Sequence, residues 1–404
     1  MRLLYIIALV TLLTSVLLVS IYWPGLHGGF FFDDGPSILQ AQGVQLESLS
    51  SESLQQALHS GGAGPSGRPI AQLSFALNHL FGGFDPFAFK ATNLAIHLIN
   101  GLLIFWLAYR ILVAGLPHTK RNHLLIASNC VATLWLLHPI QLLPVLHIVQ
   151  RMTSLSALFL LTALLLHISG RERSGMPGAY RLLIAWGLFW PLSIFTKETG
   201  ALFPLFALVW ELCIRRITHD GLDRFARGLI AVAGLSAITL VLYLALPAAQ
   251  WLWSGYELRP FSLNERLLTE TRVLWFYLGL ILFPRFEAFG LYHDDLAIST
   301  GMLYPATTLI SLTGIVGLFW LVWRNRNRAP LISFGIAWFL IGHGMESTIL
   351  PLEIAHEHRN YLPLFGILLT LAWIMLTVVK YRGAAKTLVV TLTVLAVAYI
   401  PMVT

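Results

Sequence analysis

Long apolar runs separated by short polar segments extend along the whole chain. A helix needs about twenty predominantly apolar residues to cross the hydrocarbon core of a bilayer. Such runs predict about eleven crossings, near residues 3–22, 91–114, 124–138, 153–169, 182–196, 201–214, 228–247, 302–323, 331–346, 360–379 and 386–403. The pattern therefore predicts an all-α polytopic membrane protein with a single domain over residues 1–404.

Short basic clusters between these runs predict the topology. They read "HTKRNH", "RERSGMPGAYR", "IRRITHDGLDR", "RNRNR" and "KYRGAAK". All fall on one side if the N-terminus is cytoplasmic, as the positive-inside rule requires. The outer face then receives a first loop at 23–90, a stretch at 248–301 and shorter loops at 138–153, 196–200 and 346–361. Within the first loop, short helices are predicted at 46–58 and 69–81.

One apolar segment, residues 266–286, is kept out of this count. Counting "RLLTETRVLWFYLGLILFPRF" as a crossing would place "RNRNR" on the wrong face. We therefore expect it to dip into the membrane or lie along its surface, buried against protein that satisfies its backbone.

Composition supports the membrane interpretation and narrows the function classes. The chain has 404 residues, 57% hydrophobic and 11% charged, which is too apolar for an ordinary soluble domain. Its net charge of +7 resides in the short topology clusters, so we predict no nucleic-acid partner. Both cysteines lie inside apolar runs, and no disulfide framework is implied.

An acidic pair, Asp33 and Asp34, follows three phenylalanines in "GGFFFDDGPS" just after the first crossing. Ionisable groups at the membrane boundary are costly unless they are hydrated, paired or metal-bound, which favours a functional role over a solvated turn. One carboxylate is expected to act as a general base toward an acceptor hydroxyl. The other would orient it or bind a divalent cation such as Mg²⁺ or Mn²⁺.

Cationic residues on the same predicted face suggest a phosphate ligand. They are Arg68 in "GRP", Arg151 in "VQRMT", Lys197 in "TKETG" and Arg359 in "EHRNY". Arginine suits bidentate phosphate contacts and lysine acts as a point charge, although each residue could also snorkel to lipid headgroups. Glu198 next to Lys197 is either a substrate contact or a neutralising partner.

Several histidines and a second acidic pair also fall in the outer loops. The spacing of the histidines does not match a usual zinc site, and hydrogen bonds to sugar hydroxyls or phosphate are an equal alternative to metal binding. An ordinary turn explains the acidic pair about as well as a functional role does. The candidates are His138, His147, His293, His356, His358 and Asp294 with Asp295.

Six blocks resemble a known family in their order along the chain. They begin "FFFDDGPSI", "GRPIAQLSFALNHLF", "HPIQLLPVLHIVQRMT", "TKETGALF", "RVLWFYLGLILFPRF" and "EHRNYLPLF". Together they resemble the membrane portion of the transmembrane and tetratricopeptide-containing protein O-mannosyltransferases, which are GT-C glycosyltransferases. More distantly, the layout is similar to protein O-mannosyltransferases and to the bacterial transferase that adds aminoarabinose to lipid A.

The resemblance implies an inverting transferase whose donor is a sugar on a polyprenyl phosphate. Its active site would open on the non-cytoplasmic face. Matched block by block, the catalytic base would lie in the pair Asp33 and Asp34, and the other matched positions are Arg68, Lys197, Glu198, Arg359 and Tyr361. The late block departs from the family pattern "ERYLYLP", which leaves the roles of Glu357 and His358 open.

The same resemblance leads to expectations about the acceptor and about the membrane in which the protein resides. The chain ends at Thr404 without tetratricopeptide repeats, so we expect acceptor recognition to rest on the membrane domain or on a partner. The expected acceptor is protein Ser or Thr, with lipid A or another glycan as the alternative. The expected location is a bacterial inner membrane with the active site facing the periplasm. A transporter of lipid-linked sugars and a non-catalytic scaffold remain the alternatives from other classes.

Overall fold

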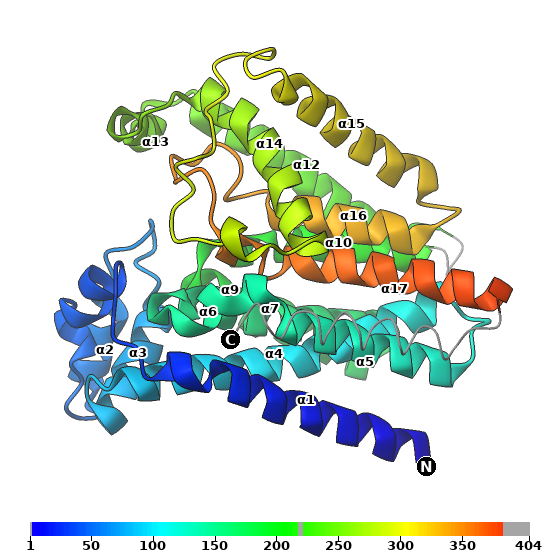
Figure 1. The fold of residues 1–404 in the computed structure, drawn as a ribbon, viewed down its shortest axis with the longest axis horizontal. Helices are drawn as coiled ribbons and strands as arrows, with labels where there is room; N and C mark the ends of the chain where they lie inside the picture. Colours follow the sequence, from blue (N-terminus) through cyan, green and yellow to red (C-terminus); the bar gives the residue numbers. More distant parts are fainter. Residues whose placement is uncertain (1, 217–220, 383–404) are drawn as a thin grey trace. The chain divides into compact units, whose positions relative to one another are not determined.

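The computed structural model describes residues 2–216 and 221–382. Within this part of the chain every regular element is a helix, and one isolated bridge joins Gly301 to Tyr304. The all-α prediction is therefore confirmed for the described residues. The described residues, whose helices are drawn in Figure 1, divide into two compact units. Unit 1 lies within Met1–Phe203 and includes residues 374–382, and unit 2 lies within Pro204–Trp373.

Unit 1 contains the first loop and the helices around it. Its helices are α1 (Arg2–Leu26), α2 (Ser51–His59), α3 (Pro69–Gly82), α4 (Pro86–Gly115), α5 (Arg121–Leu137), α6 (Leu142–Leu146), α7 (Arg151–Arg171), α8 (Met176–Ile184) and α9 (Trp190–Thr196). Short helical turns connect them, namely η1 (Gly35–Leu39), η2 (Gln42–Val44), η3 (Pro139–Gln141), η4 (Ile148–Gln150), η5 (Ala185–Phe189) and η6 (Glu198–Leu202).

The helices at the boundary and within unit 2 are α10 (Phe203–Trp210), α12 (Arg224–Leu244), α13 (Gln250–Gly255), α14 (Leu263–Leu282), α15 (Thr307–Asn325), α16 (Pro330–Gly342) and α17 (Pro363–Arg382). The turn η11 (Glu357–Asn360) precedes α17. The sequence specifies several of these starts locally. Asp85 accepts from the Phe87 N–H at the start of α4, and Ser262 with Glu265 forms a capping box on α14.

A buried apolar cluster packs the first loop against the helices of unit 1. The cluster contains Ile38, Ala41, Val44, Ala71, Phe75, Phe89, Ile148, Val149 and Met152. Full burial of a large apolar side chain contributes about 1.5–3 kcal/mol. The loop that carries the acidic pair is therefore a packed part of unit 1. Its helices α2 and α3 lie close to the predicted ranges, although α2 begins at Ser51 instead of residue 46.

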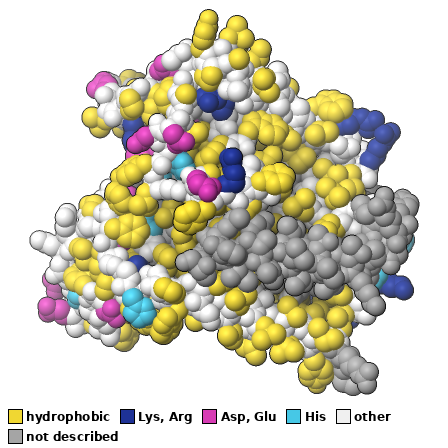
Figure 2. Space-filling model, in the orientation of Figure 1, with side chains coloured by type: hydrophobic (Ala, Val, Ile, Leu, Met, Phe, Trp, Pro, Cys, Tyr) yellow, Lys and Arg dark blue, Asp and Glu magenta, His cyan; other side chains and the backbone are white. Residues whose placement is uncertain are grey.

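Among the described residues, six helices are long and apolar enough to cross a membrane, or seven if α5 and the bent segment after it form one span. Pro139 follows α5, where the chain bends by 55°. Two shorter apolar helices, Pro330–Gly342 and Pro363–Thr377, match predicted crossings, and the last predicted crossing at 386–403 lies outside the described residues. Hydrophobic side chains cover much of the visible surface (Figure 2). These features indicate a membrane protein, while the count of eleven stays a prediction.

The segment expected to dip into or lie along the membrane, residues 266–286, is mostly helix α14. The first half of α14 carries four charged side chains, Glu265, Arg266, Glu270 and Arg272, and α14 is not among the helices that qualify as membrane spans. Its second half packs on α15, where the Trp275 Nε1–H donates to the Ser311 carbonyl at 3.1 Å. The predicted protein contact is therefore present, and the position of the segment in the membrane stays a prediction.

Candidate functional site

The two adjacent carboxylates of the first loop have opposite environments. Asp34 is fully buried, and its Oδ1 accepts from the Val149 N–H at 2.7 Å. Its Oδ2 accepts from the Phe31 N–H at 3.1 Å. Asp33 is exposed, and within the described chain no side-chain hydrogen bond or ion pair engages its carboxylate. Asp34 is thus fixed in place, whereas Asp33 is available to a ligand.

Two of the three phenylalanines before this pair, Phe30 and Phe31, fix the loop against protein. Phe30 packs edge-to-face on Phe84 and Phe89, with ring centroids 6.3 and 5.6 Å apart. Phe31 stacks on His147 at 4.4 Å. Phe32 is half exposed and adopts a left-handed backbone conformation with φ 47°, directly before Asp33. This turn presents Asp33 outward while Asp34 turns inward.

Charged neighbours surround the buried Asp34 carboxylate. The His147 Nε2 lies 3.6 Å from Oδ1, and Lys90 on α4 interacts with Asp34 electrostatically while its Nζ donates to the Gly25 carbonyl at 3.1 Å. Burial raises the pKa of Asp34 above its ordinary value. His147, the two backbone donors and Lys90 oppose that rise.

One short stretch of chain, residues 148–153, brings three sequence blocks together. Its Val149 N–H binds Asp34. The Met152 Sδ lies 3.2 Å from the Arg68 guanidinium, and the Thr153 hydroxyl accepts from Lys197 Nζ at 3.0 Å. The predicted residues Asp34, Arg68 and Lys197 therefore gather around the start of α7.

Arg68 and Glu198 form an ion pair between α3 and η6. The Arg68 Nε donates to the two Glu198 oxygens at 3.2 and 3.0 Å, and the Arg68 Nη2 lies 2.9 Å from Oε2. Each side chain is 21% exposed. Arg68 has a left-handed φ of 53°, and Pro69 follows it as the first residue of α3. Glu198 thus has a protein partner, while both side chains remain reachable by a ligand.

Arg151 is fully buried and joins helices to one another. Its guanidinium donates to the Asn93 Oδ1 at 2.7 Å, to the Phe89 carbonyl at 2.8 Å and to the Ser74 carbonyl at 3.0 Å. A phosphate group would have to displace these groups to reach it. His138 is likewise buried, and its Nδ1 accepts from the Ile140 N–H at 3.1 Å as the cap of η3.

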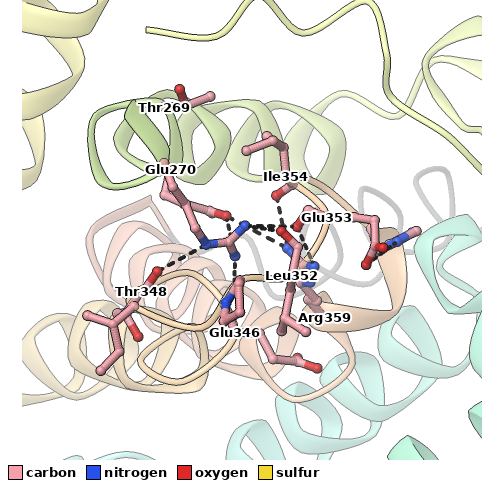
Figure 3. Close-up of polar contacts among 12 residues, drawn as sticks. Thr269, Glu270, Glu346, Thr348, Leu352, Glu353, Ile354 and Arg359 are labelled. Atoms are coloured by element: carbon pink, nitrogen blue, oxygen red, sulfur yellow. Dashed lines mark hydrogen bonds and ion pairs between the residues drawn. The ribbon is translucent and has the colours of Figure 1, made fainter. Parts of the chain in front are cut away.

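In unit 2, Arg359 lies in a buried network with Arg266 and Glu270. Figure 3 labels Glu270 and Arg359 in this network, together with the loop residues around them. Arg359 donates to the Ile354 carbonyl at 2.9 Å and to the Glu353 carbonyl at 2.7 Å. Its guanidinium lies 3.8 Å from the Glu270 carboxylate, which is also 2.9 Å from Arg266. The described contacts of Arg359 therefore shape the 346–361 loop.

Arg266 has the densest set of contacts in this network. It donates to the carbonyls of Glu346, Thr348, Leu352 and Glu353. Burial raises the pKa of Glu270 to about 6, and the charges of Arg359 and Arg266 oppose the rise. The network fixes a loop that has little regular structure of its own.

Of the remaining predicted residues of unit 2, His293 contacts a second carboxylate, that of Glu357. His293 Nε2 lies 2.8 Å from Glu357 Oε1, and Asp294 next to it is exposed. His358 stacks on His356 with centroids 5.2 Å apart, and Tyr361 is buried. Glu357, left open by the sequence, is thereby placed as the partner of His293.

Sequence reasoning missed Lys90, Arg266 and Glu270. Each is a charged residue in a helix with an apolar stretch, and that signal could have marked it as needing a buried partner. No group of three or more His, Cys, Asp or Glu suited to a metal ion occurs among residues 2–216 and 221–382.

Comparisons with known proteins find relatives of one kind. Protein O-mannosyl-transferase F38B6.6 of Caenorhabditis elegans is 24% identical over 406 aligned positions, covering 93% of this chain and 53% of the relative. Protein O-mannosyl-transferase tmtc2 of Xenopus laevis is 28% identical over 214 positions, covering 50% of this chain and 24% of the relative. Protein O-mannosyl-transferase Tmtc2 of Drosophila melanogaster is 27% identical over 281 positions, covering 67% of this chain and 29% of the relative.

No family model and no solved structure matches the chain. The chain spans about a quarter to about half of the length of these relatives, all of which are animal proteins. The C. elegans alignment includes both units and so reaches the acidic pair and the late "EHRNY" block within its 93% coverage of the chain. The resemblance inferred from the six sequence blocks is therefore confirmed: the chain resembles the TMTC2-type protein O-mannosyl-transferases.

Proposed function

We propose that this chain is a membrane glycosyltransferase that moves a sugar from a polyprenyl-phosphate donor to a hydroxyl of a protein Ser or Thr. The observation that carries the proposal is the exposed Asp33 beside the immobilised Asp34. It stands in a membrane-type helical protein that resembles relatives named protein O-mannosyl-transferases. That name also favours a protein acceptor over lipid A or another glycan.

In the proposed step, Asp33 removes the proton of the acceptor hydroxyl as its oxygen attacks the anomeric carbon of the donor. The bond from that carbon to the phosphate oxygen breaks, the anomeric configuration inverts, and the lipid phosphate leaves. Lys197 and Arg68, gathered at the start of α7, would stabilise the negative charge of the leaving phosphate. Asp34 would act by holding the turn in shape.

A divalent cation would have a restricted place in this site. Both Asp34 oxygens already accept backbone N–H groups, so Mg²⁺ or Mn²⁺ bound there would take Asp33 and the donor phosphate as ligands. The proposed topology has eleven crossings and a cytoplasmic N-terminus, which puts the first loop on the non-cytoplasmic face. The proposed location is a bacterial inner membrane, with this face toward the periplasm.

The test is transfer from synthetic polyprenyl-phosphate sugars to Ser/Thr peptides by the purified full chain. Mass spectrometry would measure the released lipid phosphate and the glycosylated peptide. Asp33→Asn should lower transfer by about 10²–10⁴-fold, the usual contribution of a general base. Glu47→Gln, an exposed carboxylate of the same loop, is the matched control and should retain transfer. Full transfer by Asp33→Asn would show that the base lies elsewhere.

A further inference from the structure

A histidine of unit 2 is held from behind by a buried carboxylate. The Glu357 Oε1 accepts from the Gly290 N–H at 3.0 Å and lies 2.8 Å from His293 Nε2. The Glu357 side chain is 3% exposed and that of His293 is 7% exposed. The Phe276 ring meets the imidazole edge-to-face at 5.1 Å, which fixes the ring further.

This arrangement determines which nitrogen of the His293 ring carries the proton. An ionised carboxylate only accepts hydrogen bonds, so Nε2 carries the proton and donates to Glu357. The neutral ring then has an acceptor at Nδ1, as in other carboxylate-histidine pairs. Within the described chain no hydrogen bond engages that nitrogen. Glu357 therefore fixes the orientation of His293 and leaves its Nδ1 able to accept a hydrogen bond from a ligand.

His293 lies in the walls of two cavities. One has a volume of about 560 Å³ and includes Arg259, Asp294 and Glu353 in its wall. The other has a volume of about 480 Å³ and includes Arg285, Glu287 and Asp295. Tyr292 and His293 belong to both, so the histidine stands where the two cavities adjoin.

The charges around these cavities are mainly acidic. Four carboxylates face two arginines in the walls, and Arg259 is already paired with Glu353 at 2.8 Å. An acceptor atom at the centre and an acidic surround suit a ligand with a hydroxyl donor and flanking positive charge. Cavities of 300–1,000 Å³ are the usual size for small ligands and short segments of chain.

The geometry points to a binding site for the acceptor peptide: a Ser or Thr hydroxyl of that peptide, other than the one that receives the sugar, donates to His293 Nδ1, with basic flanking residues against the acidic walls. This inference rests on the proposed function, since it supplies the site that recognises the acceptor of that reaction. His293 contacts the ligand, and Glu357 is a positioning residue that acts through His293. The exposed Tyr292 side chain adds an aromatic surface to the same wall.

The test measures binding separately from transfer. A fluorescent peptide with Ser and Thr flanked by Lys, and its counterpart flanked by Glu, are titrated with the full chain in detergent micelles, with fluorescence anisotropy as the readout. The wild type should bind the Lys-flanked peptide more tightly. Asp294→Asn with Asp295→Asn should reduce that preference, because it removes two of the wall carboxylates.

His293→Gln is the decisive variant. The glutamine amide can still donate to Glu357 but removes the acceptor at Nδ1, so peptide affinity should fall tenfold or more with little change in the melting midpoint. Glu357→Gln should weaken peptide binding in the same direction through loss of the ring's orientation. His118→Gln, an exposed histidine outside unit 2, is the control and should bind like the wild type.

Two results would overturn the inference. One is a wild type that binds neither peptide, and the other is a His293→Gln or Glu357→Gln variant whose melting midpoint falls while its peptide affinity stays unchanged. Failure of the proposed function looks different. In that case no polyprenyl-phosphate sugar would be consumed, although the peptide would bind and respond to His293→Gln as expected.

Discussion

In each unit the backbone of an irregular loop binds a buried charged side chain, and the loop-binding charge is negative in unit 1 and positive in unit 2. In unit 1 the Asp34 carboxylate accepts two backbone N–H groups. In unit 2 the Arg266 and Arg359 guanidinium groups donate to the backbone carbonyls of residues 346–354. A buried charge requires such partners, and a loop has donors and acceptors to supply either kind.

The two units differ in which of their charged groups a substrate can reach. In unit 1 a fixed carboxylate stands beside an exposed one, Asp33, and near a partly exposed ion pair. In unit 2 the two arginines are enclosed, and the exposed groups lie on the neighbouring cavities around His293. A charged residue in a motif can thus shape a loop and leave the contact with substrate to its neighbour.

The largest effect is expected from opening the unit 2 network. Arg266→Met should lower the free energy of unfolding by about 3–5 kcal/mol, since it removes the nearer of the two cationic partners of Glu270 and leaves several buried carbonyls without a donor. Chemical unfolding in detergent micelles would measure it. Arg259→Met is the control, because its pair with Glu353 is partly exposed and should contribute about 1 kcal/mol or less.

The outcome for Arg266 also has a sharper form. If Arg266 stabilises the protein by pairing with Glu270, the double variant Arg266→Met with Glu270→Met should have a higher free energy of unfolding than Arg266→Met alone. Other buried ion pairs that were replaced by apolar residues behave in this way. Wild-type stability in the single variant would refute the structural role assigned to Arg266.

The next effect separates the adjacent carboxylates of unit 1. Asp34→Asn should destabilise the protein by about 1–3 kcal/mol, because the amide N–H₂ would face a backbone donor and leave it unsatisfied. Asp33→Asn should change stability by about 0.5 kcal/mol or less. Thermal melting followed by tryptophan fluorescence would compare the two. Equal losses of stability would mean that the carboxylates share one environment, contrary to their burial.

A pH titration tests how much the ionised, buried Glu270 carboxylate lowers the stability of the protein. The pKa of Glu270 is raised from 4.5 to about 6, so between these values the folded state binds more protons than the unfolded state. Its contribution to stability therefore falls as the pH rises from 4.5 to about 6, by about 2 kcal/mol in total. Comparison of melting midpoints across this range should show a steeper fall in the wild type than in Glu270→Gln. Parallel curves would contradict the assignment.

The smallest effect is expected from the partly exposed pair of unit 1. A double-mutant cycle with Arg68→Met and Glu198→Gln should give a coupling energy of about 0.2–1 kcal/mol, because both side chains are 21% exposed. Added salt should weaken it. A coupling above about 3 kcal/mol would place this pair with the buried network of Arg266, against the contrast between the units.

Local sequence patterns determined much of the fold. Apolar runs predicted the long helices, and the predicted helix at 69–81 appears as α3 with Pro69 at its first position. Six ordered blocks indicated the resemblance that the curated relatives confirm. These features depend on hydrophobicity, capping and residue identity, which are read directly along the chain.

Only the tertiary structure decided which charged residues are enclosed. The letters "DD" do not show that Asp34 turns toward the Val149 N–H while Asp33 faces outward. Nor do they show that Arg151, predicted to hold a phosphate, is enclosed by the Asn93 amide and two carbonyls. The physical reason is that burial and partners come from residues 58 to 115 positions apart in the chain, brought together by packing that no local pattern encodes.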